Sequence, residues 1–187
     1  MFHFDFCPYL ELKALLADPT PLARKRFELL FIGYYGLDLA GLSQAFLQRY
    51  FQILFDGNVL SNGEPRFAPI LSELYLIPRR QGGLALQLSF VSKLVAIHSE
   101  ISPIYDQHVQ TFFSEYDPGT SVGQPGRVAW FVDFLKRVSD SYAAWAQDER
   151  LTPILQRFKA RDEKLALCHV NRLLDFLVWK VGNQKLL

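Results

Sequence analysis

Apolar residues recur along most of this chain at intervals of three and four positions, whereas alternation of apolar and polar residues is scarce. Such spacing places the apolar side chains on one face of an α-helix. In the segment 39–55, for example, Leu42, Phe46 and Tyr50 share one face. The pattern predicts an all-α fold, with helices at residues 10–16, 21–35, 39–55, 69–76, 84–98, 127–147, 151–158 and 162–181, and a further helix after Pro103.

The residues between these segments are typical of helix ends and turns. Thr20 followed by Pro21 is typical of a helix start, and Gly182 is placed to end the last helix. Residues 61–65 (SNGEP) predict a turn. Residues 2–6 alternate Phe with polar residues as a strand would. Because the sequence offers this strand no partner, we expect an extended arm that packs on the helices.

The length of the chain bounds its domain organisation. At 187 residues it fits one domain, because domains usually contain about 100–200 residues. We therefore expect a single globular α-helical domain spanning residues 1–187. The longest irregular stretch, residues 117–126, contains two prolines and three glycines. This loop is the candidate boundary if the helices form two lobes.

Composition excludes several classes of protein. Half of the residues are hydrophobic and 14% are aromatic, which is typical of a packed globule and not of a disordered chain. No apolar run reaches the roughly 18 residues of a membrane-spanning helix, so no membrane partner is expected.

The first residues lack the basic region of a secretion signal and the two cysteines are isolated, which favours the cytoplasm. The scattered histidines and the motifs present predict neither a metal nor a cofactor.

Charge is balanced overall but unevenly distributed. Twenty basic and nineteen acidic residues leave a net charge of +1, whereas tight, nonspecific nucleic-acid binders are strongly basic. Between Glu73 and Glu100, however, the chain contains no acidic residue. Arg79, Arg80 and Lys93 make this window locally basic.

Lys93 and Asp106 are the candidate catalytic residues. Lys93 interrupts an apolar predicted helix, so its ammonium either extends to solvent or points into a cleft. Burial in a cleft lowers the pKa of an amine and leaves it a nucleophile. Asp106 begins the next predicted helix, where it either caps free backbone N–H groups or lies beside Lys93 to stabilise charge. The residues alone leave both roles open for each side chain.

The residues around this pair resemble a known family. Residues 92–98 (SKLVAIH) followed by 103–109 (PIYDQHV) resemble the helix-hairpin-helix DNA glycosylase superfamily. In that family a catalytic lysine precedes a segment of the form P-x-x-V-D-T-H-V, whose aspartate is also catalytic. The segments are more closely similar to bacterial 8-oxoguanine DNA glycosylase-like proteins, and residues 171–179 (NRLLDFLVW) resemble their closing helix. The all-α prediction agrees with the fold of the family.

The resemblance implies a DNA N-glycosylase/lyase that acts on a damaged or modified base in double-stranded DNA. Lys93 would attack the sugar carbon and form a Schiff base, once the base has left the DNA stack. Asp106 would stabilise the charge that develops on the sugar, or orient Lys93.

The resemblance also implies residues that bind DNA. Arg79 and Arg80 would meet phosphates. Tyr105 and His108, which flank the candidate aspartate, would contact the DNA or the flipped base.

Two departures from the family pattern support an alternative. The family usually has an L-P-G-V-G hairpin before the lysine, whereas residues 87–92 contain no glycine. The interval between lysine and aspartate is also shorter here, by roughly a helical turn or more. Both departures concern how the backbone would clamp the DNA phosphate. The absent hairpin glycines and the near-zero net charge favour the alternative, a noncatalytic interaction or regulatory protein that keeps the glycosylase-like architecture.

Overall fold

The computed structural model describes residues 7–160 and 163–184. Within these ranges the chain is built from helices and one short two-stranded hairpin, so the all-α prediction is confirmed. The extended arm predicted for residues 2–6 lies outside the described residues. No helix in the described ranges is long and apolar enough to cross a membrane.

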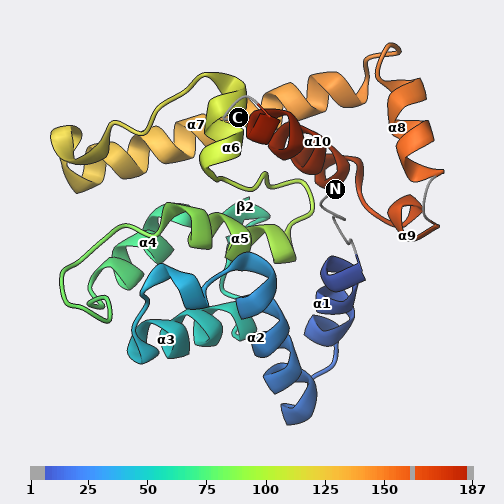
Figure 1. Ribbon diagram of the computed structural model, residues 1–187. Helices are drawn as coiled ribbons and strands as arrows, with labels where there is room; N and C mark the ends of the chain where they lie inside the picture. The colour runs from blue at the N-terminus through green and yellow to red at the C-terminus, as the bar shows by residue number, and fades with distance from the viewer. Residues whose placement is uncertain (1–6, 161–162, 185–187) are drawn as a thin grey trace.

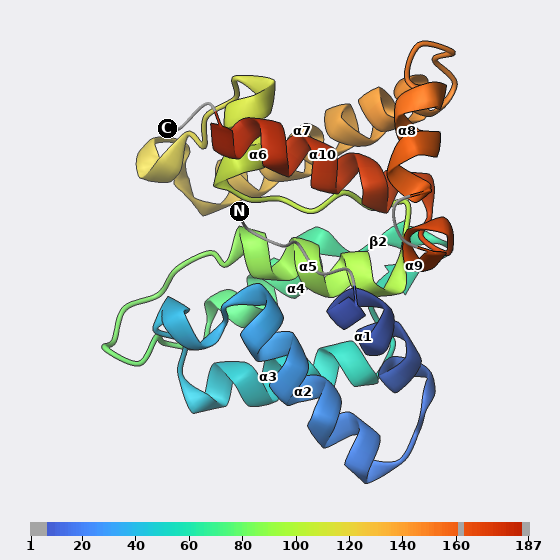
Figure 2. The same ribbon diagram turned by 45° about the vertical axis from the view of Figure 1, so that its right-hand side comes forward.

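The helices form two groups that face each other (Figure 1, Figure 2). The first group consists of α1 (Cys7–Ala17), α2 (Pro21–Tyr35), η1 (Asp38–Ala40), α3 (Gln44–Phe55), β1 (Leu60–Ser61), β2 (Glu64–Pro65), α4 (Phe67–Tyr75) and α5 (Leu88–His98). The second group consists of α6 (Gln107–Phe113), η2 (Gly119–Val122), α7 (Gly123–Ala146), α8 (Thr152–Lys159), α9 (Glu163–Ala166) and α10 (Val170–Gln184). Residues 99–106 connect the groups. Residues 117–126, the candidate boundary, lie within the second group and include η2 and the start of α7.

Side-chain caps set the starts of two helices in the first group. The Thr20 hydroxyl accepts a hydrogen bond from the backbone N–H of Ala23, so α2 begins where the sequence predicts. Helix α3 begins later than the predicted start at residue 39, because Ser43 caps it by accepting a hydrogen bond from the N–H of Phe46. The residues before Ser43 form η1, which ends at Gly41 with φ of 67°. This left-handed conformation favours glycine.

The last predicted helix, residues 162–181, is two helices in the structure. The break precedes α10, where Nδ1 of His169 accepts a hydrogen bond from the backbone N–H of Asn171 at 3.2 Å. Helix α10 packs closely against α6, which carries Asp106 at its start. A Cβ atom added to Gly182 would lie 1.9 Å from the carbonyl oxygen of His108. Only glycine allows this approach.

Aromatic side chains make the core continuous between the two groups. Phe131 of α7 is fully buried. Its ring lies edge-on to Phe67 of α4 at 5.4 Å, and edge-on to Tyr105 of the 99–106 connection at 5.3 Å between centroids. Since α4 and α7 belong to different groups, these contacts bury apolar surface from both.

Candidate functional site

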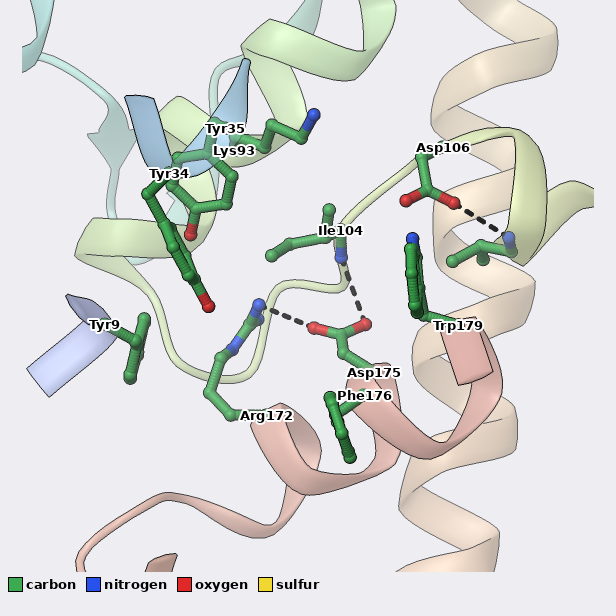
Figure 3. A pocket seen from close by; sticks show the side chains of 11 residues that line it. Tyr9, Tyr34, Tyr35, Lys93, Ile104, Asp106, Arg172, Asp175, Phe176 and Trp179 are labelled. Atoms are coloured by element: carbon green, nitrogen blue, oxygen red, sulfur yellow. Dashed lines mark hydrogen bonds and ion pairs between the residues drawn. The ribbon is translucent and has the colours of Figure 1, made fainter. Parts of the chain in front are cut away.

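A cavity of about 270 Å³ lies between the two groups of helices. Its aromatic lining residues are Tyr9, Tyr34, Tyr35, Phe176 and Trp179. Its charged lining residues are Lys93, Asp106, Arg172 and Asp175 (Figure 3). Mostly apolar walls with a few polar groups are typical of a small-molecule binding site.

Lys93 extends from α5 toward this cavity. Its Nζ atom lies 5.2 Å from the ring centre of Phe90 and 5.5 Å from that of Tyr35, which are cation–π distances. Burial lowers the pKa of the Lys93 ammonium below its ordinary value, and the negative charge of Asp106 opposes that shift only in part. A larger fraction of this amine is therefore neutral at physiological pH than in an exposed lysine.

Asp106 begins α6 and lines the same cavity. Its Oδ1 atom accepts hydrogen bonds from the backbone N–H groups of His108, at 2.9 Å, and Val109, at 3.0 Å. Figure 3 shows the second carboxylate oxygen turned away from the helix end. The same carboxylate thus caps the helix and faces the cavity, so the two roles considered for Asp106 are geometrically compatible.

Ser92 brings the two candidate catalytic residues together. Its buried hydroxyl accepts a hydrogen bond at 2.9 Å from the backbone N–H of Tyr105, the residue before Asp106. The same hydroxyl donates to the carbonyl of Ser89 within α5 at 2.8 Å. Because Ser92 directly precedes Lys93, this contact ties the helix that carries the amine to the 99–106 connection that carries the carboxylate.

Polar side chains of α10 hold the 99–106 connection in place. Nε of Arg172 donates to the carbonyl of Glu100 at 3.2 Å, and Nη2 donates to the carbonyl of Ser102. Oδ1 of Asp175 accepts a hydrogen bond from the backbone N–H of Ile104 at 3.2 Å. These contacts position the backbone immediately before Asp106.

Arg172 and Asp175 also form an ion pair, with 2.5 Å between Nη1 and Oδ2. Both side chains are buried, at 3% and 8% exposure. Burial raises the pKa of Asp175 to about 6, although the charge of Arg172, the N–H of Ile104 and the hydroxyl of Tyr142 oppose the shift. The negative charge of Asp106 raises it further. The cavity wall therefore contains a carboxyl group that titrates well above its ordinary range.

Of the six candidate residues, the two proposed as catalytic share the cavity, and the four proposed to bind DNA or the base are not among its lining residues. Tyr105 is buried in the core, edge-on to Phe131 and to Phe134. The His108 ring lies edge-on to Trp179 with 4.7 Å between centroids. His108 therefore contacts Trp179, a residue of the cavity lining, without being a lining residue itself.

Arg79 and Arg80 lie on the exposed loop between α4 and α5. Nη2 of Arg79 donates to the carbonyl of Ala40 at 3.0 Å, and the backbone N–H of Arg80 donates to the carbonyl of Gly41 at 3.0 Å. These bonds tie the loop to η1. The two arginines are thus held at the surface of the first group, away from the cavity lining.

Several lining residues were not identified from the sequence. Arg172 and Asp175 stand among apolar residues of the last helix, as Lys93 does in its own helix, and this signal was available. Tyr9 and Tyr34 carry no comparable signal, because nothing near them in sequence shows that they meet α10. Tertiary packing alone places them here.

The groups that this cavity offers a ligand are an amine, two carboxyl groups, a guanidinium and several aromatic rings. No group of three or more His, Cys, Asp or Glu side chains in the described ranges is arranged to hold a metal ion. No family model, curated protein or solved structure matches this chain.

Proposed function

We propose that this protein is a DNA glycosylase that binds a modified base of double-stranded DNA in the cavity and cleaves the bond between the base and its sugar. The observation that supports this most is that Lys93 and Asp106 line one cavity. The similarity of residues 92–98 and 103–109 to helix-hairpin-helix DNA glycosylases supports the same assignment. Arg79 and Arg80, on the loop that leads into α5, are proposed to meet DNA phosphates.

In this mechanism Lys93 acts as a neutral amine. Its Nζ atom forms a bond to C1′ of the deoxyribose while the bond from C1′ to the base breaks, and the base leaves with the electron pair and takes up a proton. The bound nitrogen then loses a proton. Opening of the sugar ring, with a proton transferred to O4′, gives a protonated Schiff base. Burial favours the neutral amine that the first step needs, because it lowers the pKa of Lys93.

Asp106 stabilises the positive charge that develops on the sugar as the base leaves. Its two hydrogen bonds to the start of α6 hold the carboxylate in one orientation before the substrate binds. A charge fixed in advance costs no reorganisation during the reaction, which is why such groups contribute strongly to catalysis.

Borohydride trapping tests the proposal. The protein is incubated with duplexes that carry 8-oxoguanine, other modified bases or an abasic site, and sodium borohydride reduces any Schiff base to a stable adduct. We expect the wild type to form an adduct and Lys93→Ala to form none. Asp106→Asn, shown by circular dichroism to be folded, should slow trapping by roughly 10²-fold or more. Lys180→Ala removes an exposed lysine of α10 and should trap like the wild type.

Other outcomes of the same assays point elsewhere. Trapping that persists in Lys93→Ala would assign the reacting amine to another residue. Release of free base without trapping would indicate that water attacks the sugar. If neither occurs with any lesion, and DNA binds more weakly than ~10⁻⁴ M at physiological salt, the noncatalytic interaction or regulatory protein becomes the better assignment.

A further inference from the structure

The hydroxyl group of Tyr9 is a buried polar group of the cavity wall that has neither a hydrogen bond nor an ion pair among the described residues. Tyr9 belongs to α1, lines the cavity and is 4% exposed. Its hydroxyl is buried and has no hydrogen-bond partner among the described residues. A buried hydroxyl without a partner destabilises a folded protein, so its presence calls for an explanation.

The neighbours of Tyr9 do not provide that partner. Arg172 and Asp175, whose charges act on the Tyr9 hydroxyl, are bound to each other and to the backbone of residues 99–106. Burial raises the pKa of the Tyr9 hydroxyl above its ordinary value, so the group keeps its proton. It is therefore a neutral hydrogen-bond donor at neutral pH.

The shape of the cavity restricts what that donor can meet. Tyr34 and Tyr35 of α2 form one wall, and Phe176 and Trp179 of α10 form another (Figure 3). Aromatic walls favour a planar ring, which stacks on their faces. The volume of about 270 Å³ is just below the range of pockets for drug-sized ligands, so it suits one small ring system.

We infer that the cavity binds a single planar heterocycle bearing a carbonyl group, and that the Tyr9 hydroxyl donates a hydrogen bond to this carbonyl. This inference rests on the proposed function for its ligand, a nucleobase. Tyr9 lies across the cavity from Asp106 in Figure 3. With the sugar held at Lys93 and Asp106, the base extends toward Tyr9, which selects carbonyl-bearing bases over those without one.

Tyr9→Phe removes the hydroxyl and keeps the ring. Calorimetric titration with free 8-oxoguanine, uracil and adenine measures the affinity of each base for wild type and variant. We expect the wild type to bind a carbonyl-bearing base more tightly than adenine, and Tyr9→Phe to weaken that binding by roughly 3- to 10-fold. The unfolding temperature of Tyr9→Phe should equal or exceed that of the wild type, since no hydrogen bond of the free protein is lost.

Tyr50→Phe is the matched control. Tyr50 is equally buried, its hydroxyl donates to the carbonyl of Phe90 at 2.8 Å, and it is not among the residues that line the cavity. This variant should unfold at a lower temperature and bind the bases unchanged. Lower stability with unchanged base affinity is the result expected for a tyrosine whose hydroxyl only stabilises the fold. For Tyr9→Phe we expect the opposite, unchanged or higher stability with weaker base binding.

Two results would overturn the inference: equal affinity of Tyr9→Phe and wild type for the carbonyl-bearing bases, or no binding of any free base by the wild type. The proposed function fails separately. If trapping depends on Lys93 but base affinity is insensitive to Tyr9, the glycosylase assignment stands and the inference falls. If base binding depends on Tyr9 but no adduct or released base appears, the inference stands and the glycosylase assignment falls.

Discussion

The charged residues of the cavity differ in how their neighbours hold them. Burial lowers the pKa of Lys93, while the charge of Asp106 and the cation–π contacts with Tyr35 and Phe90 favour the ammonium form. Asp175, in contrast, is held by an arginine and a backbone N–H, yet its pKa is still raised to about 6. At both residues the loss of water outweighs the favourable partners, although Lys93 is only partly buried.

The raised pKa of Asp175 predicts a pH dependence of stability. In the unfolded chain the group titrates near 3.8, and in the folded protein near 6, so the folded state binds more protons between these values. Its contribution to stability is therefore complete below about pH 4 and is lost as the pH rises through 6. Urea unfolding from pH 4 to 7 should show the wild type losing up to about 3 kcal/mol relative to Asp175→Asn.

The comparison with Asp175→Asn is needed because other groups titrate in the same range. Burial lowers the pKa of His98, which makes stability rise with pH through about 6.5 and partly masks the effect of Asp175. The variant keeps His98 and removes only the carboxyl group, at a constant cost of roughly 3–5 kcal/mol from the unpaired Arg172. Parallel pH profiles for the two proteins would show that Asp175 titrates normally.

A site residue could be predicted from the sequence where its side chain differs in polarity from the residues around it or lies at a predicted helix start. A lysine within an apolar helix and an aspartate at a helix start both stand out, and the structure places Lys93 and Asp106 in one cavity. The distant partners were not predictable. Tyr9 lines the same cavity as residues of α10, and no spacing rule links positions so far apart in the sequence.

At the scale of helices, the contact between α6 and α10 positions the site. Helix α6 begins at the cap formed by Asp106, and α10 carries Arg172 and Asp175, which fix the connection before it. Gly182 lets the two helices approach so closely that a Cβ atom at this position would collide with the carbonyl of His108. A displacement of α10 would therefore move both the cap and the connection.

Gly182→Ala tests this contact. The added methyl group would lie 1.9 Å from the carbonyl oxygen of His108. This clash can be relieved only if α6 or α10 moves, because the contacted atom belongs to the backbone. We expect a loss of roughly 1–3 kcal/mol in urea unfolding, typical of overpacking, together with slower trapping, because Asp106 shifts with α6.

Gly33→Ala is the matched control. Gly33 lies within α2, and no neighbouring atom lies within 4 Å of its added methyl group. Alanine should therefore stabilise the protein by roughly 0.5–1 kcal/mol through helix propensity. Equal effects of the two substitutions would show that α6 and α10 are not in close contact.

Helix positions followed from apolar spacing, whereas local capping signals marked only some helix ends. Gly182, predicted to end the last helix, lies inside α10 (Val170–Gln184), so that prediction was wrong. Thr20 with Pro21 gave the start of α2. The later start of α3 depends on which of several polar residues acts as the cap, and the structure selects Ser43. The break before α10 depends on His169, a residue that also occurs within helices. Such competition is resolved by tertiary contacts, which the local pattern does not contain.

At the scale of the molecule, the two groups of helices share one core. The ring of Phe131 contacts Phe67 in one group and Tyr105 in the connection. Shared burial of this kind couples the unfolding of two parts, because neither keeps its apolar surface covered without the other. We therefore expect the chain to unfold as a single cooperative unit.

Phe131→Ala tests this coupling. The substitution should cost roughly 3–5 kcal/mol, as for other fully buried phenylalanines. All three tryptophans, Trp130, Trp145 and Trp179, lie on α7 and α10, so their fluorescence reports on the second group. Far-UV circular dichroism reports on the helices of both groups.

In the wild type and in Phe131→Ala, urea transitions followed by fluorescence and by circular dichroism should coincide. Separate transitions in the wild type would mean that the two groups of helices are independent domains.

The composition of the cavity wall has a consequence for biosynthesis. Tyr9 leaves the ribosome early, whereas Trp179 is added only after α1–α9 have been translated. The first group of helices can begin to pack while translation continues, since chains fold from the N-terminus as they are made. A nascent chain that already contains Lys93 and Asp106 therefore still lacks the wall that α10 supplies. The cavity is complete only once α10 has been translated and packed, so a nascent chain that ends before α10 presents Lys93 without this wall.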